Sequence, residues 1–359
     1  MGRATKARSK GDNSQGPVST NEIAVINVTH TVASGEGMPF AELSPDRVIA
    51  AIERLGFTCD GRVLALNSYE NRVYQIGLET DAPLVAKFYR PGRWTRDAIL
   101  EEHQFSSALA GGDVPVIAPM TVDGRSLHEI EGYLYAIFPR RGGRWPELGS
   151  TDDRVLMGRF LARLHLIGAA GRFEHRRRLG SEEFGWQARD VVLECPLVPH
   201  YVVDKYAALT ESLLNRTDQF LESYDFVARL RIHGDCHRGN ILWTDAGAHF
   251  VDLDDCMTGP AMQDLWMLLA GSRDEMRRQM ADYVEGYEQF RPFDRSELGL
   301  IEPLRALRLV HYSGWLAARW RDPAFPRAFP WFGEPRYWEN HLSALAEQLE
   351  AMDQDALTL

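Results

Sequence analysis

Three oxygen-bearing side chains in the second half of the chain have the types and spacing needed to handle a phosphoryl group. Asp235 is followed five positions later by Asn240, and Asp252 comes shortly afterwards. Mg²⁺ prefers hard oxygen ligands, so one carboxylate and one carboxamide, completed by water and phosphate oxygens, suffice to hold it. A further carboxylate can accept the proton of an attacking hydroxyl group. The pattern predicts Asp235 as the catalytic base and Asn240 with Asp252 as magnesium ligands, Asp252 being catalytic through its metal.

The residues between Asn240 and Asp252 predict how these two ligands meet. Apolar residues at 241–243, a turn at 244–247 and a strand at 249–251 have the pattern of a β-hairpin, which would return Asp252 to the side of Asn240. His-Gly-Asp at 233–235 alone, or Asp-Leu-Asp at 252–254 alone, is more typical of a surface turn with ordinary carboxylates. Their ordered combination, with the Asp-to-Asn spacing of protein-kinase catalytic loops, is much more specific.

A lysine on a predicted upstream strand could hold the non-transferred phosphates of ATP. Lys87 lies between apolar neighbours such as Val85 and Phe88, a buried setting in which an ammonium group needs an anionic partner. The following helix offers Glu102 as that partner, with Glu101 as the second choice. A solvated strand lysine is the alternative, and the apolar neighbours disfavour it.

No glycine-rich GxGxxG loop occurs in the first part of the chain, so another segment must cover the phosphates. The turn at 67–71 lies between the first two predicted strands. Its backbone N–H groups and the Ser68 hydroxyl could donate to phosphate oxygens. An ordinary hairpin turn explains the same residues almost as well.

A sheet and several helices must position these residues, and the patterns along the chain predict both. Strands are expected at 63–66, 72–76, 84–89, 116–117, 128–130 and 133–138, and helices at 44–55, 96–109, 154–167, 206–221, 264–269, 297–318 and 337–352. The strands concentrate in the first part, where three of them form an antiparallel meander. The predicted fold class is therefore α+β, a protein-kinase-like bilobal fold with a small antiparallel-sheet lobe, one key helix and a mostly helical large lobe.

The predicted organisation has three parts. Residues 1–40 are rich in Gly, Ser, Thr and charge and have the composition of a flexible extension. Residues 41–138 would form the small lobe, which binds the ATP phosphates. Residues 139–359 would form the large lobe with the catalytic loop, the metal site and the acceptor site, and a ligand cleft is expected between the lobes.

Composition limits the classes of function. The chain has 359 residues, of which 45% are hydrophobic and 25% charged, and its formal net charge is -11. An acidic chain lacks a broad attraction for nucleic acid or anionic membranes, and no apolar span is long enough to cross a bilayer. We expect a cytoplasmic monomer that binds neither.

The four cysteines are scattered, form no CxxC pair and are too few to staple a chain of this length. Reduced thiols in the cytoplasm fit this pattern best. A zinc site around Cys236 and His237 would need Cys256 and His249 as further ligands, and incidental proximity is the preferred interpretation.

Several segments resemble one known family. They are 66–75 (LNSYENRVYQ), 87–91 (KFYRP), 101–105 (EEHQF), 233–243 (HGDCHRGNILW), 251–255 (VDLDD), 264–269 (DLWMLL) and 299–306 (GLIEPLRA). On these residues the chain is similar to the aminoglycoside phosphotransferase and choline kinase superfamily, and within it to bacterial stress-response protein kinases. The resemblance covers about residues 43–338 and implies a protein-kinase fold without a glycine-rich loop.

The resemblance also implies a function. It implies a bacterial cytoplasmic serine/threonine protein kinase that uses ATP and Mg²⁺, phosphorylates proteins including itself, and counters stress-induced death. Carried over by position, Asp235 is the proton acceptor, and Asn240 and Asp252 hold the metal. Ser68 becomes an ATP contact, while the lysine–glutamate pair comes from the wider fold.

Two departures from ordinary protein kinases leave the acceptor, the molecule that receives the phosphoryl group, open. Gly234 stands where an arginine usually reads a phosphorylated activation loop, and residues 252–254 read Asp-Leu-Asp instead of Asp-Phe-Gly. Switching by an activation loop is therefore not expected. The segment 259–264 is also short for a peptide-docking segment.

Two alternatives to a protein kinase follow. A small-molecule kinase could act on the hydroxyl of an amino alcohol, a sugar or an antibiotic, and Asp254, Asp255 and Glu183 could hold a cationic acceptor. The second alternative is a nucleotide-binding pseudokinase that acts as a scaffold. A pseudokinase would lack a catalytic residue, whereas this sequence has all of the predicted ones. The resemblance favours the protein acceptor.

Overall fold

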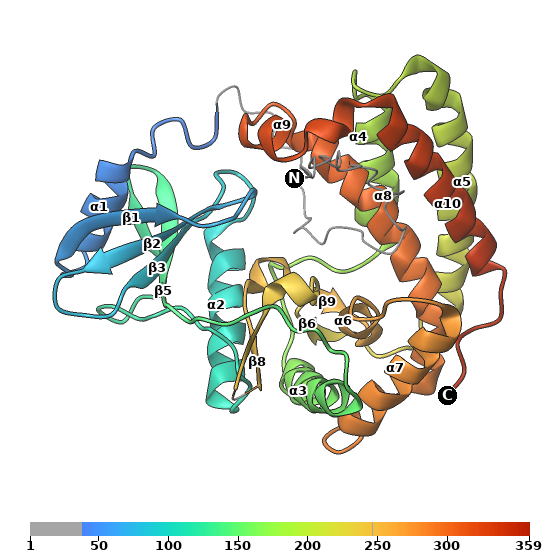
Figure 1. Ribbon diagram of the computed structural model, residues 1–359, viewed down its shortest axis with the longest axis horizontal. Coiled ribbons are helices and arrows are strands. Elements are labelled where there is room, and N and C mark those ends of the chain that lie inside the picture. Colours follow the sequence, from blue (N-terminus) through green and yellow to red (C-terminus); the bar gives the residue numbers. More distant parts are fainter. Residues whose placement is uncertain (1–37, 246) are drawn as a thin grey trace, which may run out of the picture.

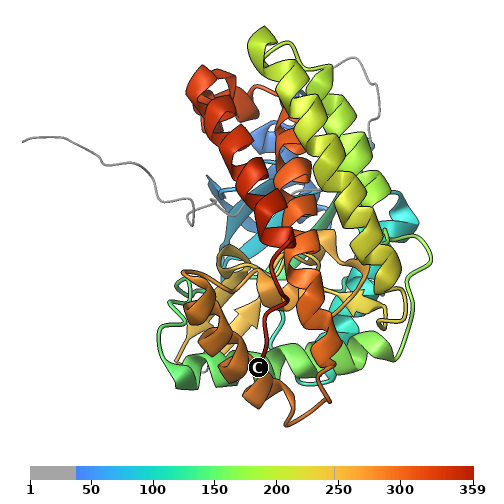
Figure 2. The ribbon, with the colours of Figure 1, turned by 90° about the vertical axis from the view of Figure 1, so that its right-hand side faces the viewer.

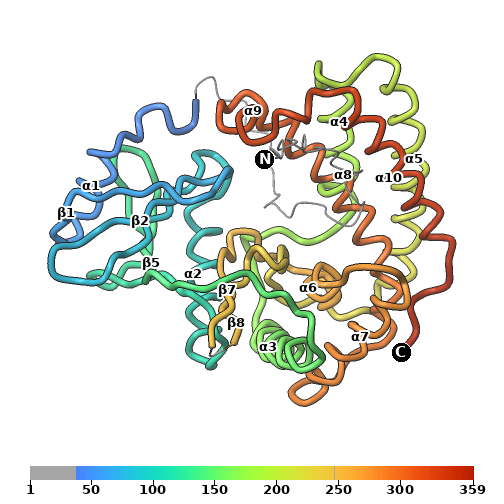
Figure 3. Tube along the Cα trace, viewed as in Figure 1, coloured from blue at the N-terminus to red at the C-terminus, as the bar shows by residue number. Residues whose placement is uncertain are grey.

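The computed structural model describes residues 38–245 and 247–359, and Figures 1 and 3 show their arrangement. The extension predicted at residues 1–40 therefore lies outside the described residues except for its last three. The sheet lies at one end of the molecule, and most of the helices lie at the other (Figure 1). The α+β fold class is confirmed.

Five strands of the first part form one sheet in the order β1-β2-β3-β5-β4. Their bounds are β1 Cys59–Ala65, β2 Arg72–Leu78, β3 Leu84–Phe88, β4 His128–Ile130 and β5 Tyr133–Pro139. Adjacent strands are antiparallel throughout, so the predicted meander is confirmed. Lys87 pairs with Val73 on one side and Ala136 on the other, which places it in the middle of the sheet.

Two helices accompany the sheet, and a side-chain cap starts each of them. α1 (Pro45–Glu53) follows Ser44, whose hydroxyl accepts a backbone N–H from the first turn. α2 (Arg96–Gly111) follows Thr95, which caps it in the same way. Both caps satisfy N–H groups that have no partner inside the helix. α2 is the helix predicted to carry Glu102.

The strand predicted at 116–117 is not part of this sheet. Val116 instead bridges to Phe250 in a hairpin of the second part, and the Ile117 N–H donates to the Phe250 carbonyl at 3.1 Å. Apolar β-branched residues indicate an extended backbone but do not choose its partner. Tertiary packing thus ties the segment after α2 to the hairpin that carries the predicted metal ligands.

The second part of the chain is mostly helical. Its helices are α3 Thr151–Ala169, α4 Ala188–Leu193, α5 His200–Ser223, α6 Met262–Trp266, α7 Arg273–Tyr287, α8 Ile301–Arg319, α9 Ala324–Ala328 and α10 Pro335–Met352. Shorter turns of helix are η1 Glu182–Gln187, η2 Arg238–Asn240, η3 Leu253–Asp255, η4 Arg295–Leu300 and η5 Pro330–Gly333. Two small sheets pair β7 Ile241–Thr244 with β8 Gly247–Phe250, and β6 Leu230–Ile232 with β9 Met257–Gly259.

The sequence patterns miss α7 because charged residues dominate it. Its buried residues are Met280, Tyr283, Val284, Gly286 and Tyr287. It packs on α3 at two glycines. A Cβ at Gly158 would lie 2.0 Å from the Tyr283 carbonyl oxygen, and one at Gly286 would lie 1.9 Å from the Val155 carbonyl oxygen. The two backbones therefore approach more closely than any side chain allows.

The helices α5, α8 and α10 run side by side (Figure 2). Aromatic side chains fill this region, and Trp315, Trp338, Phe325 and Phe332 are completely buried in it. Burial of such large side chains is the main stabilising contribution to this layer. This packing gives α8 a rigid support.

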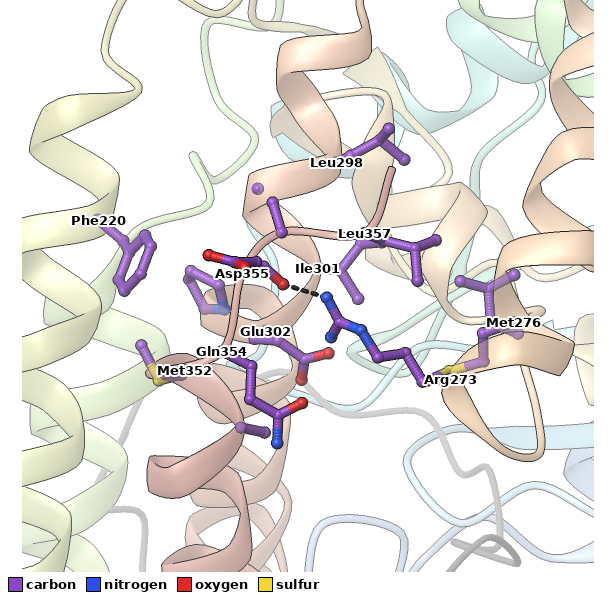
Figure 4. A pocket seen from close by; sticks show the side chains of 15 residues that line it. Phe220, Arg273, Met276, Leu298, Ile301, Glu302, Met352, Gln354, Asp355 and Leu357 are labelled. Atoms are coloured by element: carbon purple, nitrogen blue, oxygen red, sulfur yellow. Dashed lines mark hydrogen bonds between the residues drawn. The ribbon is translucent and has the colours of Figure 1, made fainter. Parts of the chain in front are cut away.

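The segment after α10 folds back over a small cavity of about 30 Å³. Figure 4 shows Arg273 of α7 reaching to Asp355, to whose backbone carbonyl it donates a hydrogen bond. Leu357 is buried nearby.

None of the helices in the described residues is both long enough and apolar enough to cross a membrane.

Candidate active site

The loop at residues 233–240 is held by one buried carboxylate. Asp264 of α6 accepts the backbone N–H groups of His233 and Gly234, both at 2.8 Å. Gly234 has a φ of +84°, and a Cβ there would lie 2.3 Å from the Asp255 carbonyl oxygen. The glycine that departs from ordinary protein kinases is therefore required by the close approach of two backbone segments.

The Asp235 carboxyl is buried, and three side chains contact it. Arg308 of α8 lies 2.7 Å from Oδ1, the His237 ring lies 3.3 Å from Oδ2, and Asn240 Nδ2 donates to Oδ2 at 3.2 Å. Burial acts to raise the pKa of this carboxyl, but Arg308 and His237 outweigh it and hold the pKa well below its usual range. Asp235 is therefore ionised at neutral pH.

The predicted hairpin is present and brings Asn240 and Asp252 to the same end. Ile241 pairs with Phe250 across it, and the Val251 N–H donates to the Asn240 carbonyl at 3.0 Å. Asp252 follows with a φ of +57°, a left-handed conformation that is uncommon for a residue with a side chain. Such conformations occur preferentially where function needs a side chain in one place.

Lys87 lies among three carboxylates. Its Nζ is 2.9 Å from Asp252, 3.1 Å from Asp254 and 3.6 Å from Glu102. Burial acts to lower the pKa of the ammonium group, but the carboxylates outweigh it and raise the pKa well above its usual value. The Lys87 ammonium group, for which one anionic partner was predicted, therefore has three.

The two candidate glutamates on α2 point to different places. Glu102 faces Lys87, whereas Glu101 accepts the backbone N–H groups of residues 174–176 at 2.6 to 3.0 Å. Burial raises the pKa of Glu102 to about 7, against the attraction of Lys87. Glu101 thus anchors α2 to the helical part of the chain, while Glu102 is placed to position the lysine.

The turn at 67–71 reaches the same carboxylates through Asn71. Its Nδ2 donates to Asp254 at 3.1 Å, and its Oδ1 accepts the Arg90 N–H at 3.1 Å. The Ser68 hydroxyl donates to the Asn71 carbonyl at 3.2 Å and is partly exposed. Ser68 therefore shapes the turn here, and its contact with ATP stays a prediction.

Arginines of the chain engage the acidic residues that the sequence offered to a cationic acceptor. Arg93 bonds Asp254 and lies 2.5 Å from Asp255. Burial raises the pKa of Asp255 to about 7 although Arg93 opposes it. Glu183 pairs with Arg177 at 2.7 Å. These carboxylates are already neutralised within the protein.

The predicted magnesium ligands have donor atoms that fit a hard divalent cation. Asn240 directs its Nδ2 to Asp235, so its carboxamide oxygen is the atom able to meet a metal. The Asp252 side chain is 28% exposed and offers a carboxylate oxygen. Oxygen donors of this kind suit Mg²⁺. Within 38–245 and 247–359, no three or more His, Cys, Asp or Glu side chains are grouped as a metal site.

Comparison with known families identifies the class of enzyme. The sequence pattern of the phosphotransferase enzyme family, APH, matches residues 62–301, a segment that includes the sheet, the catalytic loop and both predicted metal ligands. The chain belongs to this family. Its predicted identity as a phosphotransferase is thereby confirmed, and the loop and hairpin described above lie within the matched segment.

Curated relatives of this phosphotransferase carry kinase names. Stress response kinase A of Escherichia coli (strain K12) is 44% identical over 326 residues, which cover 89% of this chain and 97% of that protein. Serine/threonine protein kinase RdoA of Salmonella typhimurium is 45% identical over 320 residues, with the same shares covered. The predicted resemblance to bacterial stress-response kinases is confirmed.

Solved structures share the fold of this phosphotransferase at lower identity. Amicoumacin kinase hAmiN, in complex with AMP-PNP, Ca²⁺ and Ami, has a TM-score of 0.66 at 18% identity and covers 87% of this chain and 95% of that chain. The microcompartment-associated aminopropanol kinase has a TM-score of 0.63 at 20% identity and covers 87% and 99%. These likenesses establish the fold.

Sequence patterns missed three side chains that shape the phosphotransferase site. Arg308 contacts the predicted base, Asp264 holds the loop at 233–240, and Arg93 pairs with the acids that follow the predicted metal ligand Asp252. Asp264 opens an apolar run, where a lone acidic residue was the available signal. Arg308 and Arg93 had no local signal, because an arginine on a helix or a loop is ordinarily a solvated residue.

Proposed function

We propose that the protein is an ATP- and Mg²⁺-dependent serine/threonine protein kinase that phosphorylates other proteins and itself, and that it acts as a cytoplasmic monomer in the bacterial stress response. One observation carries the proposal: the predicted phosphate-binding cation Lys87, the predicted metal ligand Asp252 and the predicted base Asp235 lie in one site. The names of relatives that are 44% to 45% identical support a protein acceptor and the stress setting.

In this proposal each residue has one task. Lys87 holds the non-transferred phosphates, and Glu102 orients its ammonium group. Asp235 accepts the proton of the acceptor hydroxyl while the hydroxyl oxygen bonds to the γ-phosphorus. The bond from that phosphorus to the β,γ-bridging oxygen breaks, and ADP leaves. A bound Mg²⁺ supplies neutralisation of phosphate charge, and Asn240 and Asp252 would hold it.

Solved neighbours support the choice of nucleotide and divalent metal. Amicoumacin kinase was crystallised with AMP-PNP and Ca²⁺, and spectinomycin phosphotransferase, with a TM-score of 0.59, was crystallised with ADP. Ser68 lies on the turn that would cover the phosphates.

The four cysteines form no disulfide, which suits a reducing compartment.

A small-molecule hydroxyl kinase is the second candidate, and two observations favour it. The solved neighbours are named for small acceptors such as aminopropanol and spectinomycin. In addition, β9 ends at Gly259 and α6 begins at Met262, which leaves no long segment for docking a peptide. The arginines on the acidic residues of the site argue against a cationic small acceptor.

ATP turnover by the wild type and by Asp235→Ala tests the proposal. With Mg²⁺ and ATP, the wild type should turn over ATP and gain phosphate on its own serine or threonine residues, as detected by mass spectrometry. Asp235→Ala should be slower by about 10²- to 10⁴-fold, the usual contribution of a general base. Equal ATP turnover by the wild type and Asp235→Ala would contradict the assignment of Asp235 as the base. No turnover in the wild type would favour the pseudokinase.

Phosphosite mapping in a host lysate tests the acceptor. The wild type should add phosphate to serine and threonine residues of proteins, whereas Asp252→Ala, which lacks the predicted metal carboxylate, should not. Equal protein phosphorylation by both would contradict the protein-kinase assignment. Turnover only with aminopropanol or a similar alcohol would transfer the proposal to the second candidate.

A further inference from the structure

A cavity of about 340 Å³ lies beside the predicted base, on the helical side of the site. Its lining includes His237 and Arg308, whose side chains both contact the Asp235 carboxyl. Side chains of α8 and α10, Trp266 of α6 and the segment between α6 and α7 form most of the remaining wall. A hydroxyl group that passes its proton to Asp235 must approach that carboxyl. The cavity borders two of its contacts and is therefore a candidate for the acceptor site.

Cationic side chains face this cavity. Arg305 and Arg308 both line it from α8. Arg305 is kept at the wall by Glu302, 2.9 Å away, and its guanidinium group lies 5.6 Å from the centre of the Trp266 ring. Glu347, the one acidic residue of the described lining, is exposed at its edge. The lining therefore presents more positive than negative charge.

Carboxylates outside the lining pair with arginines, Asp235 with Arg308 and Glu302 with Arg305. Asp254 and Asp255 are engaged by Arg93, and Glu183 is engaged by Arg177. A cationic amino alcohol or aminoglycoside in the cavity would meet two guanidinium groups, each already paired with one carboxylate and each with further N–H donors. An acceptor with its own carboxylate would instead form charge-assisted hydrogen bonds with them.

We propose that this cavity selects acceptors that carry a carboxylate near the reacting hydroxyl, which in a protein means a serine or threonine flanked by acidic residues. A guanidinium group has five N–H donors in a planar fork. Arg308 can therefore contact Asp235 and an acceptor carboxylate together, which aligns the hydroxyl with the base. Arg305 supplies the second cation. The inference rests on the proposed kinase activity and names the acceptor class for it.

Two peptides that differ only beside the serine test the inference. One has Asp and Glu flanks, and the other has Asn and Gln at the same positions. The full-length wild type should phosphorylate the acidic peptide with a KM about 10- to 100-fold lower, which is the range expected from one or two charge-assisted hydrogen bonds. Aminopropanol, a cationic acceptor, should be turned over no faster than the neutral peptide.

Variants of Arg305 and Arg308 test whether these two side chains cause the preference for the acidic peptide. Arg305→Gln should reduce the preference for the acidic peptide, measured as the ratio of the two KM values, about 10-fold, and Arg305→Glu should reverse it. Arg308→Lys keeps the charge but loses the planar fork, so it should also reduce the ratio. Arg295→Gln is the matched control, since Arg295 is exposed and pairs with Glu288 outside the cavity. It should leave the ratio unchanged.

The ratio separates selection from a general loss of structure, because unfolding or a damaged base affects both peptides equally. Equal KM values for the two peptides in the wild type, or faster turnover of aminopropanol than of the acidic peptide, would overturn the inference and leave the kinase activity standing. Absence of ATP turnover with every acceptor would overturn the kinase proposal and the inference with it.

Discussion

Buried side chains of opposite charge meet at almost every functional position of this site. Lys87 lies against Asp252, Asp254 and Glu102, and Arg308 lies against Asp235. A charge that is removed from water is costly unless a partner and hydrogen bonds compensate it. Each functional residue is therefore held by the residue that neutralises it, and substitution of one partner has consequences for the other.

The adjacent glutamates of α2 make a matched pair for mutation. Glu102→Gln removes a charge next to Lys87, so the lysine should be less well oriented and kcat/KM for ATP should fall about 10-fold, or roughly 1.4 kcal/mol. Glu101→Gln weakens the contacts with residues 174–176 instead. It should mainly lower the free energy of unfolding, by about 1 to 3 kcal/mol. The opposite pattern would make Glu101 the lysine partner.

Glu297 should make stability depend on pH. It is buried and accepts the Met262 N–H at 2.7 Å, and burial raises its pKa from 4.5 to about 7. The folded chain therefore keeps this proton to a higher pH than the unfolded chain does. The group's contribution to stability is complete below pH 4.5 and falls by roughly 3 kcal/mol as the pH rises to about 7.

Denaturant titrations of Glu297→Gln and of the wild type across this pH range measure that contribution. Glutamine still offers an oxygen to the Met262 N–H but does not ionise. The variant should therefore gain stability relative to the wild type as the pH rises. A difference that stays constant from pH 4.5 to 7 contradicts the raised pKa.

Close helix packing decides the geometry at the scale of the elements. α3 and α7 touch through Gly158 and Gly286, and the hairpin β7–β8 is tied to the segment after α2 through Val116 and Phe250. Glycine permits such contacts because it has no Cβ. These contacts place the elements that carry the loop and the predicted metal ligands relative to one another.

Gly158→Ala tests the packing of α3 on α7. The new Cβ would lie 2.0 Å from the Tyr283 carbonyl oxygen, so the helices must separate. Overpacking of this kind costs about 1 to 3 kcal/mol, which urea denaturation can measure. Gly111→Ala in α2 is the control because no atom lies within 4 Å of its Cβ. A Gly158→Ala variant as stable as the wild type would show that the helices adapt freely.

An ionic network joins the sheet to the helical part at the scale of the whole molecule. Glu70 lies in the turn at 67–71, 2.8 Å from Arg90 and 3.1 Å from Arg319 of α8, and it accepts the Trp315 indole N–H at 2.8 Å. Asp322 pairs with Arg90 at 2.6 Å. The two parts are thus held together by charges placed far apart in the sequence.

Removal of the central carboxylate should loosen this network. Glu70→Ala would leave Arg90 and Arg319 buried with less compensation, and the free energy of unfolding should fall by about 3 to 5 kcal/mol. Glu131→Ala, which removes a partly exposed partner of Arg47, should cost about 1 kcal/mol or less. Thermal denaturation of both variants checks the contrast. Equal losses would mean that the network contributes no more than a surface ion pair.

The sequence by itself determined the features that depend on neighbouring residues. The spacing of Asp235 and Asn240, the hairpin that leads to Asp252 and the strand that carries Lys87 all follow from motifs and periodicity within a few residues. Local patterns decide such features because each residue's backbone preference and the alternation of apolar side chains act over short distances. The sequence patterns did not predict α7, because its charged residues obscure its apolar stripe.

Only the tertiary structure decided which distant side chains complete the site. It placed Arg308 on Asp235 across 73 positions, brought Asp254 to Lys87, and required a glycine at position 234. These outcomes depend on how helices and sheet pack, and no local pattern encodes the approach of two segments far apart in the chain. The same packing paired with arginines the acidic residues that the sequence offered to a cationic acceptor, Asp254, Asp255 and Glu183.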